Sequence, residues 1–340
     1  MPLDRTGRRM QADCRARGEP TMYERYDTDE QPIAEDGELI RPDRRTFLAA
    51  LAATSAGLLA GGLPDLAAAA PTRGSLQRQV VELVTSMRRQ GMLQPSEKTS
   101  WSVYDFSARK KVVSINEGVP RQAASMIKPL VAQAYFFQMD GKRGQVRYTD
   151  EVRRSMERML QRSSNPDTNK IMDLVSEQQS RRGPADVELV LKQRAPAVFQ
   201  ETRIVEKIPT TGQTYRNQAS AHDYSRFLIS VWDGRMPNSK EMLRMMGLPS
   251  GNRLSKGVAA LPEAARVYNK TGSTAMLCGD MGVIEIPDRR GRNHAYTVVG
   301  IIERPSRAEN YGAWIRSRGD VIRRVSNLIY QDMKDRYRLV

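Results

Sequence analysis

The chain has 340 residues, of which 54 are Lys or Arg and 39 are Asp or Glu, a formal net charge of +15. This length suits one large domain or two small ones, and a hydrophobic content of 39% is ordinary for a globular protein. The charge is uneven. Residues 1–70 hold 9 basic and 12 acidic residues, which leaves 45 against 27, or +18, in residues 71–340. A body this basic favours anionic partners such as acidic envelope polymers, or it presents a solvated basic face with no specific ligand.

The first 69 residues are predicted to be a leader and an export signal. Residues 1–42 are polar and net acidic, and we expect them to be disordered. Residues 43–69, "DRRTFLAALAATSAGLLAGGLPDLAAA", join twin arginines to an apolar stretch and an Ala-x-Ala end. These are the features of a Tat-like signal cleaved after Ala69, so the mature protein is expected in the periplasm or outside the cell. The alternative is an uncleaved membrane anchor, although about 17 apolar residues are few for a membrane-spanning helix.

Cleavage would remove Cys14 and leave Cys278 as the single thiol, without an internal disulfide.

In the body of the chain, apolar residues follow helix and strand periods in a clear order. A helix is predicted for residues 75–90, and two short strands joined by a turn are predicted within 99–115. The stretch 120–247 is mainly helical. Three strands follow from residue 265 onward, and a last helix is predicted for 317–334.

Strands at both ends and helices in the middle predict a mixed α/β chain of the α+β kind. The simplest arrangement joins the strands in one antiparallel sheet, flanks it with the terminal helices and inserts an all-helical part. Within a domain of residues 70–340, we expect the sheet part at about 75–118 and 263–340, and the helical part at about 119–262. A cleft is expected where the two parts meet, which is a usual place for a binding site.

A serine and a lysine stand three positions apart in Ser125-Met126-Ile127-Lys128, on one face of a predicted helix. On the first turn, free backbone N–H groups and the helix dipole favour negative charge developing at Ser125. Lys128 can accept the serine proton if burial or a neighbouring cation disfavours its charged form. The pair alone is weak evidence, because Ser-x-x-Lys occurs by chance in many helices.

Two further segments strengthen the catalytic interpretation. In "SSNPDTN", Ser163 and Asn165 can point two polar groups into a cleft, although the segment alone is typical of an ordinary helix N-cap. "KTGS", which begins at Lys270, lies on a predicted strand. Its glycine leaves room for a ligand near the backbone, and its lysine and threonine can hold a carboxylate. Taken alone, this second segment is also compatible with an edge strand and a turn.

In this order, the segments resemble the active-site motifs S-x-x-K, S-D-N and K-T-G of class A serine β-lactamases and penicillin-binding proteins. The flanking stretches "GPADVELVLKQRAP", "NQASAHDYSRFL" and "VYNKTGS" are similar to family segments as well, so the resemblance spans about residues 75–335. It implies the class A fold and an active-site-serine hydrolase that uses no metal or other cofactor.

Carried over residue by residue, the resemblance implies that Ser125 is the nucleophile and that Lys128 is its base or proton relay. Ser163 would pass a proton to the leaving nitrogen, and Asn165 would orient the substrate amide. The implied substrate-binding residues are Lys270, Thr271, Gly272 and Ser273. The lysine of this group would also keep Lys128 partly neutral by like-charge repulsion. The backbone N–H groups of Ser125 and Ser273 would form the oxyanion hole.

The omega loop, "ETRIVEKIPTTGQTYRNQAS" at 201–220, departs from the family pattern. Class A β-lactamases carry a glutamate there that activates the deacylating water, and the aligned residue is Ile208. Glu206 is close and could replace that glutamate if the loop is shifted. The family arginine after the catalytic strand is also missing, with Met281 in its place. Without a water-activating carboxylate, an acyl-enzyme forms but hydrolyses slowly.

These observations favour an exported active-site-serine acyl hydrolase or acyltransferase. It would form a Ser125 acyl-enzyme with β-lactams or peptidoglycan-type peptides and deacylate slowly. One alternative is a true class A β-lactamase that uses Glu206 as the water activator. Another is a non-catalytic protein on the same fold, whose basic body binds anionic envelope polymers. A nucleic-acid partner is not expected, because export opposes it and no binding motif appears, and we expect a monomer.

Overall fold

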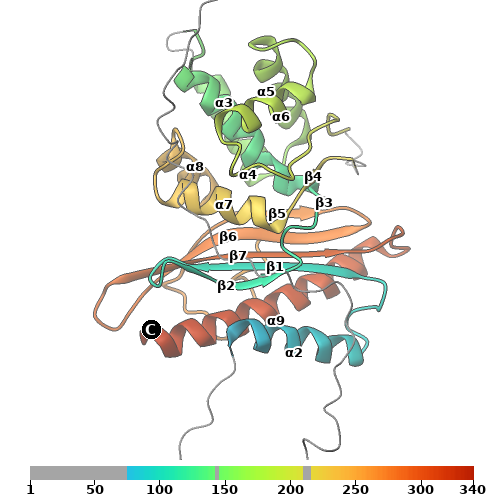
Figure 1. Ribbon diagram of the computed structural model, residues 1–340, viewed down its shortest axis with the longest axis vertical. Helices are drawn as coiled ribbons and strands as arrows, with labels where there is room; N and C mark the ends of the chain where they lie inside the picture. Colours follow the sequence, from blue (N-terminus) through green and yellow to red (C-terminus); the bar gives the residue numbers. More distant parts are fainter. Residues whose placement is uncertain (1–74, 142–144, 210–215) are drawn as a thin grey trace, which may run out of the picture. The chain divides into compact units, whose positions relative to one another are not determined.

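The computed structural model describes residues 75–141, 145–209 and 216–340. The predicted leader and export signal lie outside these residues. The described chain forms a five-stranded antiparallel sheet with helices on both faces (Figure 1). Within the described residues, no helix is long and apolar enough to cross a membrane.

The sheet has the strand order β2-β1-β7-β6-β5, so the N-terminal strands pair with the last strand of the chain. Its strands are β1 (Lys98–Asp105), β2 (Lys110–Ile115), β5 (Arg266–Ser273), β6 (Leu277–Pro287) and β7 (Asn293–Glu303). The central strands are buried along most of their length because helices cover both faces. The prediction of one antiparallel sheet built from both ends of the chain is therefore confirmed. A separate ladder pairs β3 (Arg121–Gln122) with β4 (Gln218–Ala219) and is too short for sequence periodicity to reveal.

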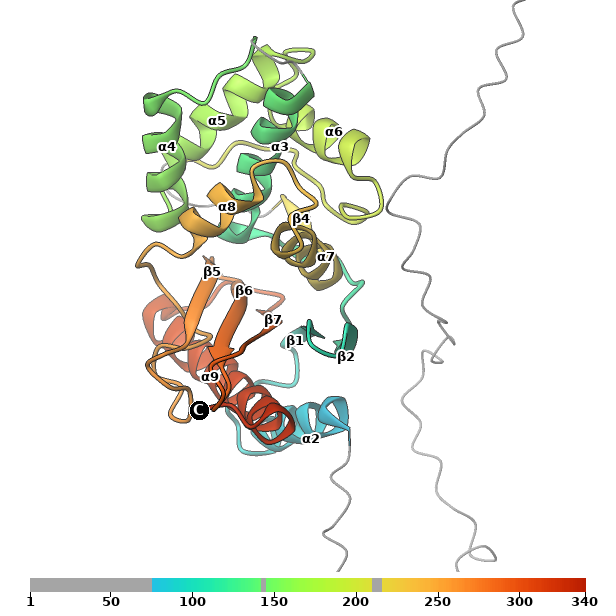
Figure 2. The same ribbon diagram turned by 90° about the vertical axis from the view of Figure 1, so that its left-hand side faces the viewer.

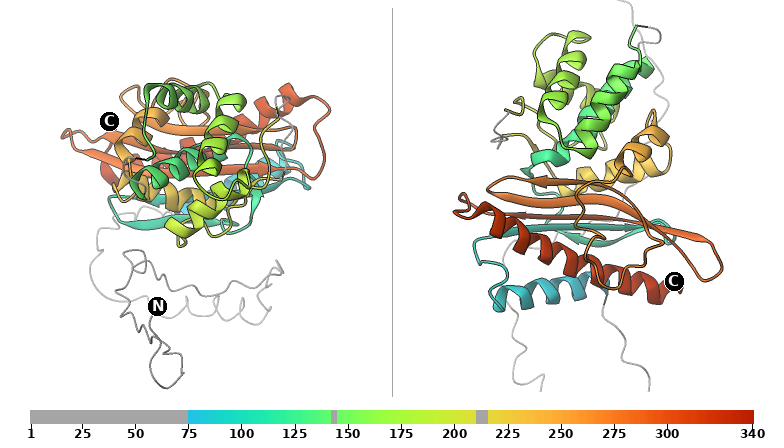
Figure 3. Two further views of the ribbon diagram at one scale, coloured as in Figure 1. Left: turned by 90° about the horizontal axis from the view of Figure 1, so that it is seen from above. Right: turned by 180° about the vertical axis from the view of Figure 1, so that it is seen from behind.

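The terminal helices α2 (Leu76–Arg89) and α9 (Tyr311–Tyr337) lie side by side on one face of the sheet (Figures 1 and 3). The other face carries the helical part, in which η1, α7 and α8 contact the sheet and the other helices lie beyond them (Figure 2). These elements are η1 (Ala124–Ile127), α3 (Lys128–Gly141), α4 (Asp150–Gln161), α5 (Asn165–Glu177), α6 (Pro184–Arg194), α7 (Ala221–Trp232) and α8 (Ser239–Met246). The main core lies between the sheet and the pair α2 and α9.

Helix α9 begins six residues before the predicted start at 317, and local contacts explain the difference. The side chain of Asn310 accepts a hydrogen bond from Ala313 N at 2.9 Å, which caps the helix. In the first turns, Trp314 Nε1 and Arg318 Nε donate to Glu97 Oε1 at 2.7 and 2.8 Å. These buried contacts fix the start of α9 beside the start of β1. They join residues more than 200 positions apart, so no local sequence pattern indicates them.

Candidate active site

Ser125 lies in η1, a 3-10 turn, and not in the first turn of the α-helix as expected; helix α3 begins at Lys128. Ala124 takes a left-handed φ of 46°, which turns the chain sharply before the serine. Ala123 N donates to Asn217 O at 2.8 Å and ties this turn to the far end of the omega loop. The 3-10 turn is thus held by tertiary contacts, and the side chain of Ser125 remains half-buried.

Close packing places Ser125 beside the strand that carries the K-T-G motif. Met126 is fully buried against two glycines, Gly272 on β5 and Gly279 on β6. A Cβ atom on Gly272 would lie 2.9 Å from Met126 Cγ, and one on Gly279 would lie 2.7 Å from Met126 Cε. Both separations are too short for a real side chain, so the glycines permit the close approach of η1 to the sheet.

Lys128 connects the first two motifs. It has no exposed surface. Its Nζ donates to Ser163 O at 2.5 Å, to Ser163 Oγ at 3.1 Å and to Asn165 Oδ1 at 2.8 Å. The structure therefore brings Ser163 and Asn165 around the amine of Lys128.

The amine of Lys128 experiences opposing effects. Burial is the larger effect and the positive charge of Lys270 is the smaller one, and together they lower the pKa of Lys128 to about 7. The three hydrogen-bond acceptors suit the charged form, since an ammonium group has three donors to offer. A pKa near neutrality means that a substantial fraction of the amine is neutral at physiological pH. A neutral amine at 3.1 Å from the Ser163 hydroxyl can accept and return a proton as a general base.

The S-D-N-like segment is shaped by its middle residue. Ser164 caps α5 by accepting from Asp167 N at 3.3 Å, and its hydroxyl donates to Asp167 Oδ2 at 2.6 Å. Asp167 in turn binds Arg158 through Oδ1 at 2.6 Å. Ser163 has a left-handed φ of 58°, which directs its carbonyl and hydroxyl to Lys128. Ser164, at the middle position, therefore acts as the N-cap of α5, and Ser163 and Asn165 face the site.

The K-T-G strand contributes a second buried cation. Lys270 is 3% exposed, and its Nζ donates to Thr271 O at 3.1 Å. Burial lowers the pKa of Lys270 to about 8, with opposing effects from the Asp280 carboxylate, which raises it, and Arg253, which lowers it. Thr271 is half-buried on the same strand. Lys270 is thus charged at neutral pH and can hold an anionic group.

Sequence reasoning missed Arg253, which supplies a guanidinium to the same strand from the segment before β5. Its Nη2 donates to Ser273 Oγ at 2.7 Å, and its Nη1 donates to Gly279 O at 2.8 Å. Its own N–H donates to the buried carboxylate of Asp280 at 2.7 Å. Met281, which occupies the position of the family arginine, is fully buried. The one sequence signal is a Gly-Asn turn before Arg253, which is too common to identify a site residue.

The omega loop places an apolar residue, Ile208, next to α5, the helix that begins in the S-D-N-like segment. Asn169 holds Ile208 through both backbone groups: Ile208 N donates to Asn169 Oδ1 at 2.8 Å, and Asn169 Nδ2 donates to Ile208 O at 2.7 Å. Asn165 Nδ2 reaches Pro209 O at 3.3 Å. Ile208 is 2% exposed, so it fills this position as a packed hydrophobic residue.

Glu206, the alternative water activator, has contacts with other residues of the loop. Its Oε1 accepts a hydrogen bond from Arg216 N at 2.9 Å, and Asn217 binds both backbone groups of Glu206. The loop residue that Asn169 binds is Ile208, the residue aligned with the family's glutamate. The role of Glu206 remains a hypothesis for the experiments below.

Comparison with known proteins agrees with this geometry. The profile of the beta-lactamase enzyme family matches residues 83–333. The chain belongs to this family of class A serine β-lactamases and penicillin-binding proteins. It is accordingly a serine hydrolase with the class A fold. No curated protein matches the chain.

Solved structures share the fold at low sequence identity. The structure of PBP-A has 22% identity and a TM-score of 0.59, and the match covers 76% of this chain and 96% of that one. A mutant of PBP-A, solved as an acyl-enzyme complex with penicillin G, has 20% identity and the same TM-score and coverage. A β-lactamase from Desulfarculus baarsii DSM 2075 has 14% identity and a TM-score of 0.60, covering 76% of this chain and 98% of its own.

Proposed function

We propose that the protein is an exported acyl-transfer enzyme whose Ser125 is acylated by β-lactams or peptidoglycan-type peptides and releases the acyl group slowly. The buried amine of Lys128 carries this proposal. It contacts Ser163 and Asn165, and its pKa is lowered to about 7. A lysine in a merely structural ion pair would keep a high pKa, whereas a lysine that serves as a base needs a pKa near the working pH.

In the proposed reaction, Ser125 Oγ attacks the carbonyl carbon of the substrate amide, and neutral Lys128 accepts the hydroxyl proton. Collapse of the tetrahedral intermediate breaks the C–N bond. The leaving nitrogen takes a proton from the hydroxyl of Ser163, and Lys128 returns its proton to Ser163. The products are an ester on Ser125 and a neutral amine, so the proton lost by the serine ends on the leaving nitrogen. The amine of Lys128 donates a hydrogen bond to Ser163 Oγ at 3.1 Å, which supports this relay.

Binding of the substrate carboxylate is assigned to the K-T-G strand. Lys270 and Thr271 would hold the carboxylate, and Arg253 adds a second positive charge through its contact with Ser273 Oγ. Lys270 on the strand and Arg253 beside it favour a monoanionic substrate over a neutral one. The backbone N–H groups of Ser125 and Ser273 would stabilise the oxyanion, and each such donor is typically worth about 3 kcal/mol in the transition state.

Slow deacylation follows from the residue at position 208. Hydrolysis of the ester needs a water molecule activated by a general base. Asn169 binds the backbone of Ile208, the residue that aligns with the family's glutamate, and an isoleucine cannot take a proton from water. The structure of the PBP-A mutant as an acyl-enzyme complex with penicillin G supports acylation of this fold by a β-lactam.

Intact-protein mass spectrometry of the full chain mixed with penicillin G tests the proposal. We expect an adduct of the penicillin mass in the wild type and none in Ser125→Ala. The matched control Ser96→Ala removes an exposed serine and should behave as the wild type. Rapid loss of the adduct while the drug is consumed would favour the β-lactamase alternative with Glu206. No adduct with any penicillin would favour the envelope-binding alternative.

Export is a separate part of the proposal and has its own test. The motif that supports it is the twin arginine, Arg44 and Arg45, before an apolar stretch. Replacing both arginines by lysine should retain the longer precursor inside the cell, as seen by cell fractionation and immunoblotting. Unchanged export of this variant would contradict a Tat-type route.

A further inference from the structure

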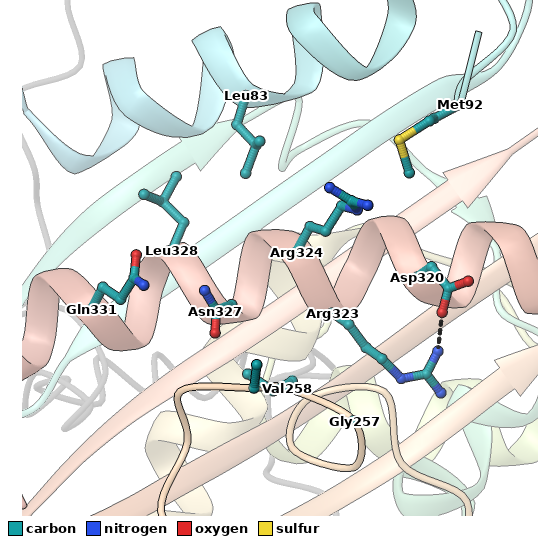
Figure 4. A pocket seen from close by; sticks show the side chains of 11 residues that line it. Leu83, Met92, Gly257, Val258, Asp320, Arg323, Arg324, Asn327, Leu328 and Gln331 are labelled. Carbon is teal, nitrogen blue, oxygen red and sulfur yellow. Dashed lines mark hydrogen bonds and ion pairs between the residues drawn. The ribbon is translucent and has the colours of Figure 1, made fainter. Parts of the chain in front are cut away.

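A groove of about 540 Å³ runs along the outer face of α9, on the opposite side of the sheet from Ser125. Figure 4 shows α2 forming one wall with Leu83, and the turn after α2 extending that wall with Met92. The segment at Val258 forms the other wall. The floor is α9 itself, including Arg324 and Leu328. The groove is therefore distinct from the candidate active site, none of whose residues line it.

The groove has an apolar side. Leu83 and Leu328 face one another between α2 and α9 (Figure 4). Together with Met92, they are half-buried and pack against the main hydrophobic core. Their exposed parts form an apolar strip beside the polar floor. The volume lies within the roughly 300–1,000 Å³ that is typical of small-molecule sites.

The groove also holds an unbalanced positive charge. Arg323 is neutralised, because its Nη1 binds Asp320 Oδ1 at 2.9 Å and its Nε donates to Lys256 O at 2.7 Å. Arg324 is exposed in the groove and has no hydrogen bond or ion pair with any residue that the structure describes. Asn327 accepts from Ala260 N through Oδ1, which leaves its NH₂ group as a further donor. A guanidinium group without a partner beside an apolar strip suits a ligand with one anionic end.

We propose that this groove binds a small monoanionic amphiphile, an aliphatic or aromatic body that carries a single carboxylate, sulfate or phosphodiester group. The body lies against Leu83, Met92 and Leu328, and the anionic group pairs with Arg324. A neutral ligand would leave the guanidinium unpaired, and a cation would be repelled by it. A polyanion would find one free positive charge where it needs several. The charge and shape of the groove thus select a monoanion with an apolar body.

Four probe molecules separate charge from apolar contact: decanoate, decan-1-ol, acetate and decyltrimethylammonium, each used below its micelle concentration. Isothermal titration calorimetry on the full chain should rank decanoate first. Arg324→Gln should weaken decanoate binding by about fivefold, the upper value for an ion pair open to solvent. The matched control Arg316→Gln removes an exposed arginine of the same helix that does not line the groove, and it should leave the affinity unchanged.

A second variant tests the apolar strip. Leu83→Ser should weaken the binding of decanoate and decan-1-ol by similar factors, since both have the same chain. Circular dichroism and thermal unfolding of each variant show whether the fold is kept, independently of any serine chemistry. Equal decanoate affinity in the wild type and in Arg324→Gln would overturn the proposal. So would binding of acetate or decyltrimethylammonium as tight as that of decanoate.

Discussion

The rate of acylation should follow the titration of Lys128, because only the neutral amine can accept the proton of Ser125. With a pKa of about 7, roughly a tenth of the amine is neutral at pH 6 and roughly nine-tenths at pH 8. At saturating penicillin G, the acylation rate constant should therefore rise about tenfold between these pH values. At limiting penicillin, the rate should fall again at higher pH, since Lys270 loses its charge around pH 8 and no longer holds the carboxylate.

Removal of the charge on Lys270 is the matched perturbation. The Lys270 ammonium lowers the pKa of Lys128, so this pKa should be higher in Lys270→Gln. The rise of the acylation rate constant with pH, the rising limb of the profile, should then move to higher pH. Lys256→Gln removes an exposed lysine before β5 and should keep the wild-type profile. Rapid-quench mass spectrometry from pH 5 to pH 9 gives the rates. A wild-type rate constant that does not change between pH 6 and pH 8, or a limb that moves to lower pH in Lys270→Gln, would refute the assignment of Lys128 as the base.

Three further variants probe the same site. Between pH 7 and pH 9, Lys128 holds more protons in the unfolded chain than in the folded one. The free energy of unfolding of the wild type, measured in urea relative to Lys128→Met, should therefore rise by about 2 kcal/mol over this range. A difference that does not change with pH would contradict the burial argument. Gly272→Ala pushes on Met126 and should slow acylation by about tenfold or more, whereas Gly118→Ala, with no atom within 4 Å of its added Cβ, should not. Arg253→Gln should raise the penicillin concentration for half-maximal acylation by about tenfold at an unchanged limiting rate, and an unchanged concentration would exclude Arg253 from carboxylate binding.

The fold was predictable where residues act through local periodicity. Alternating and continuous apolar runs predicted all five main strands, and the apolar stripe of residues 75–90 predicted α2. The 3-10 turn at Ser125 was not predictable, because it depends on Met126 packing against glycines of two distant strands. The early start of α9 likewise depends on Glu97, far away in the sequence.

The site was predictable where motifs carry it and not where tertiary structure does. The structure gathers Ser163 and Asn165, both from the second motif, around the amine of Lys128 from the first motif. Arg253 belongs to no motif, and its place beside Ser273 follows from the path of the segment before β5. The contact between Asn169 and Ile208 joins the helix of the second motif to the omega loop, and no local sequence pattern indicates it.

The lifetime of the acyl-enzyme tests the central claim most directly. The full chain is acylated with penicillin G, excess drug is removed on a desalting column, and the adduct on Ser125 is followed by intact-protein mass spectrometry. The account predicts a long-lived adduct in the wild type and a lifetime at least about a hundredfold shorter in Ile208→Glu, where a carboxylate is restored. The matched variant Ile208→Gln should keep the long lifetime. A wild-type adduct that clears within seconds, and that persists in Glu206→Gln, would show that Glu206 activates water and would contradict the claim.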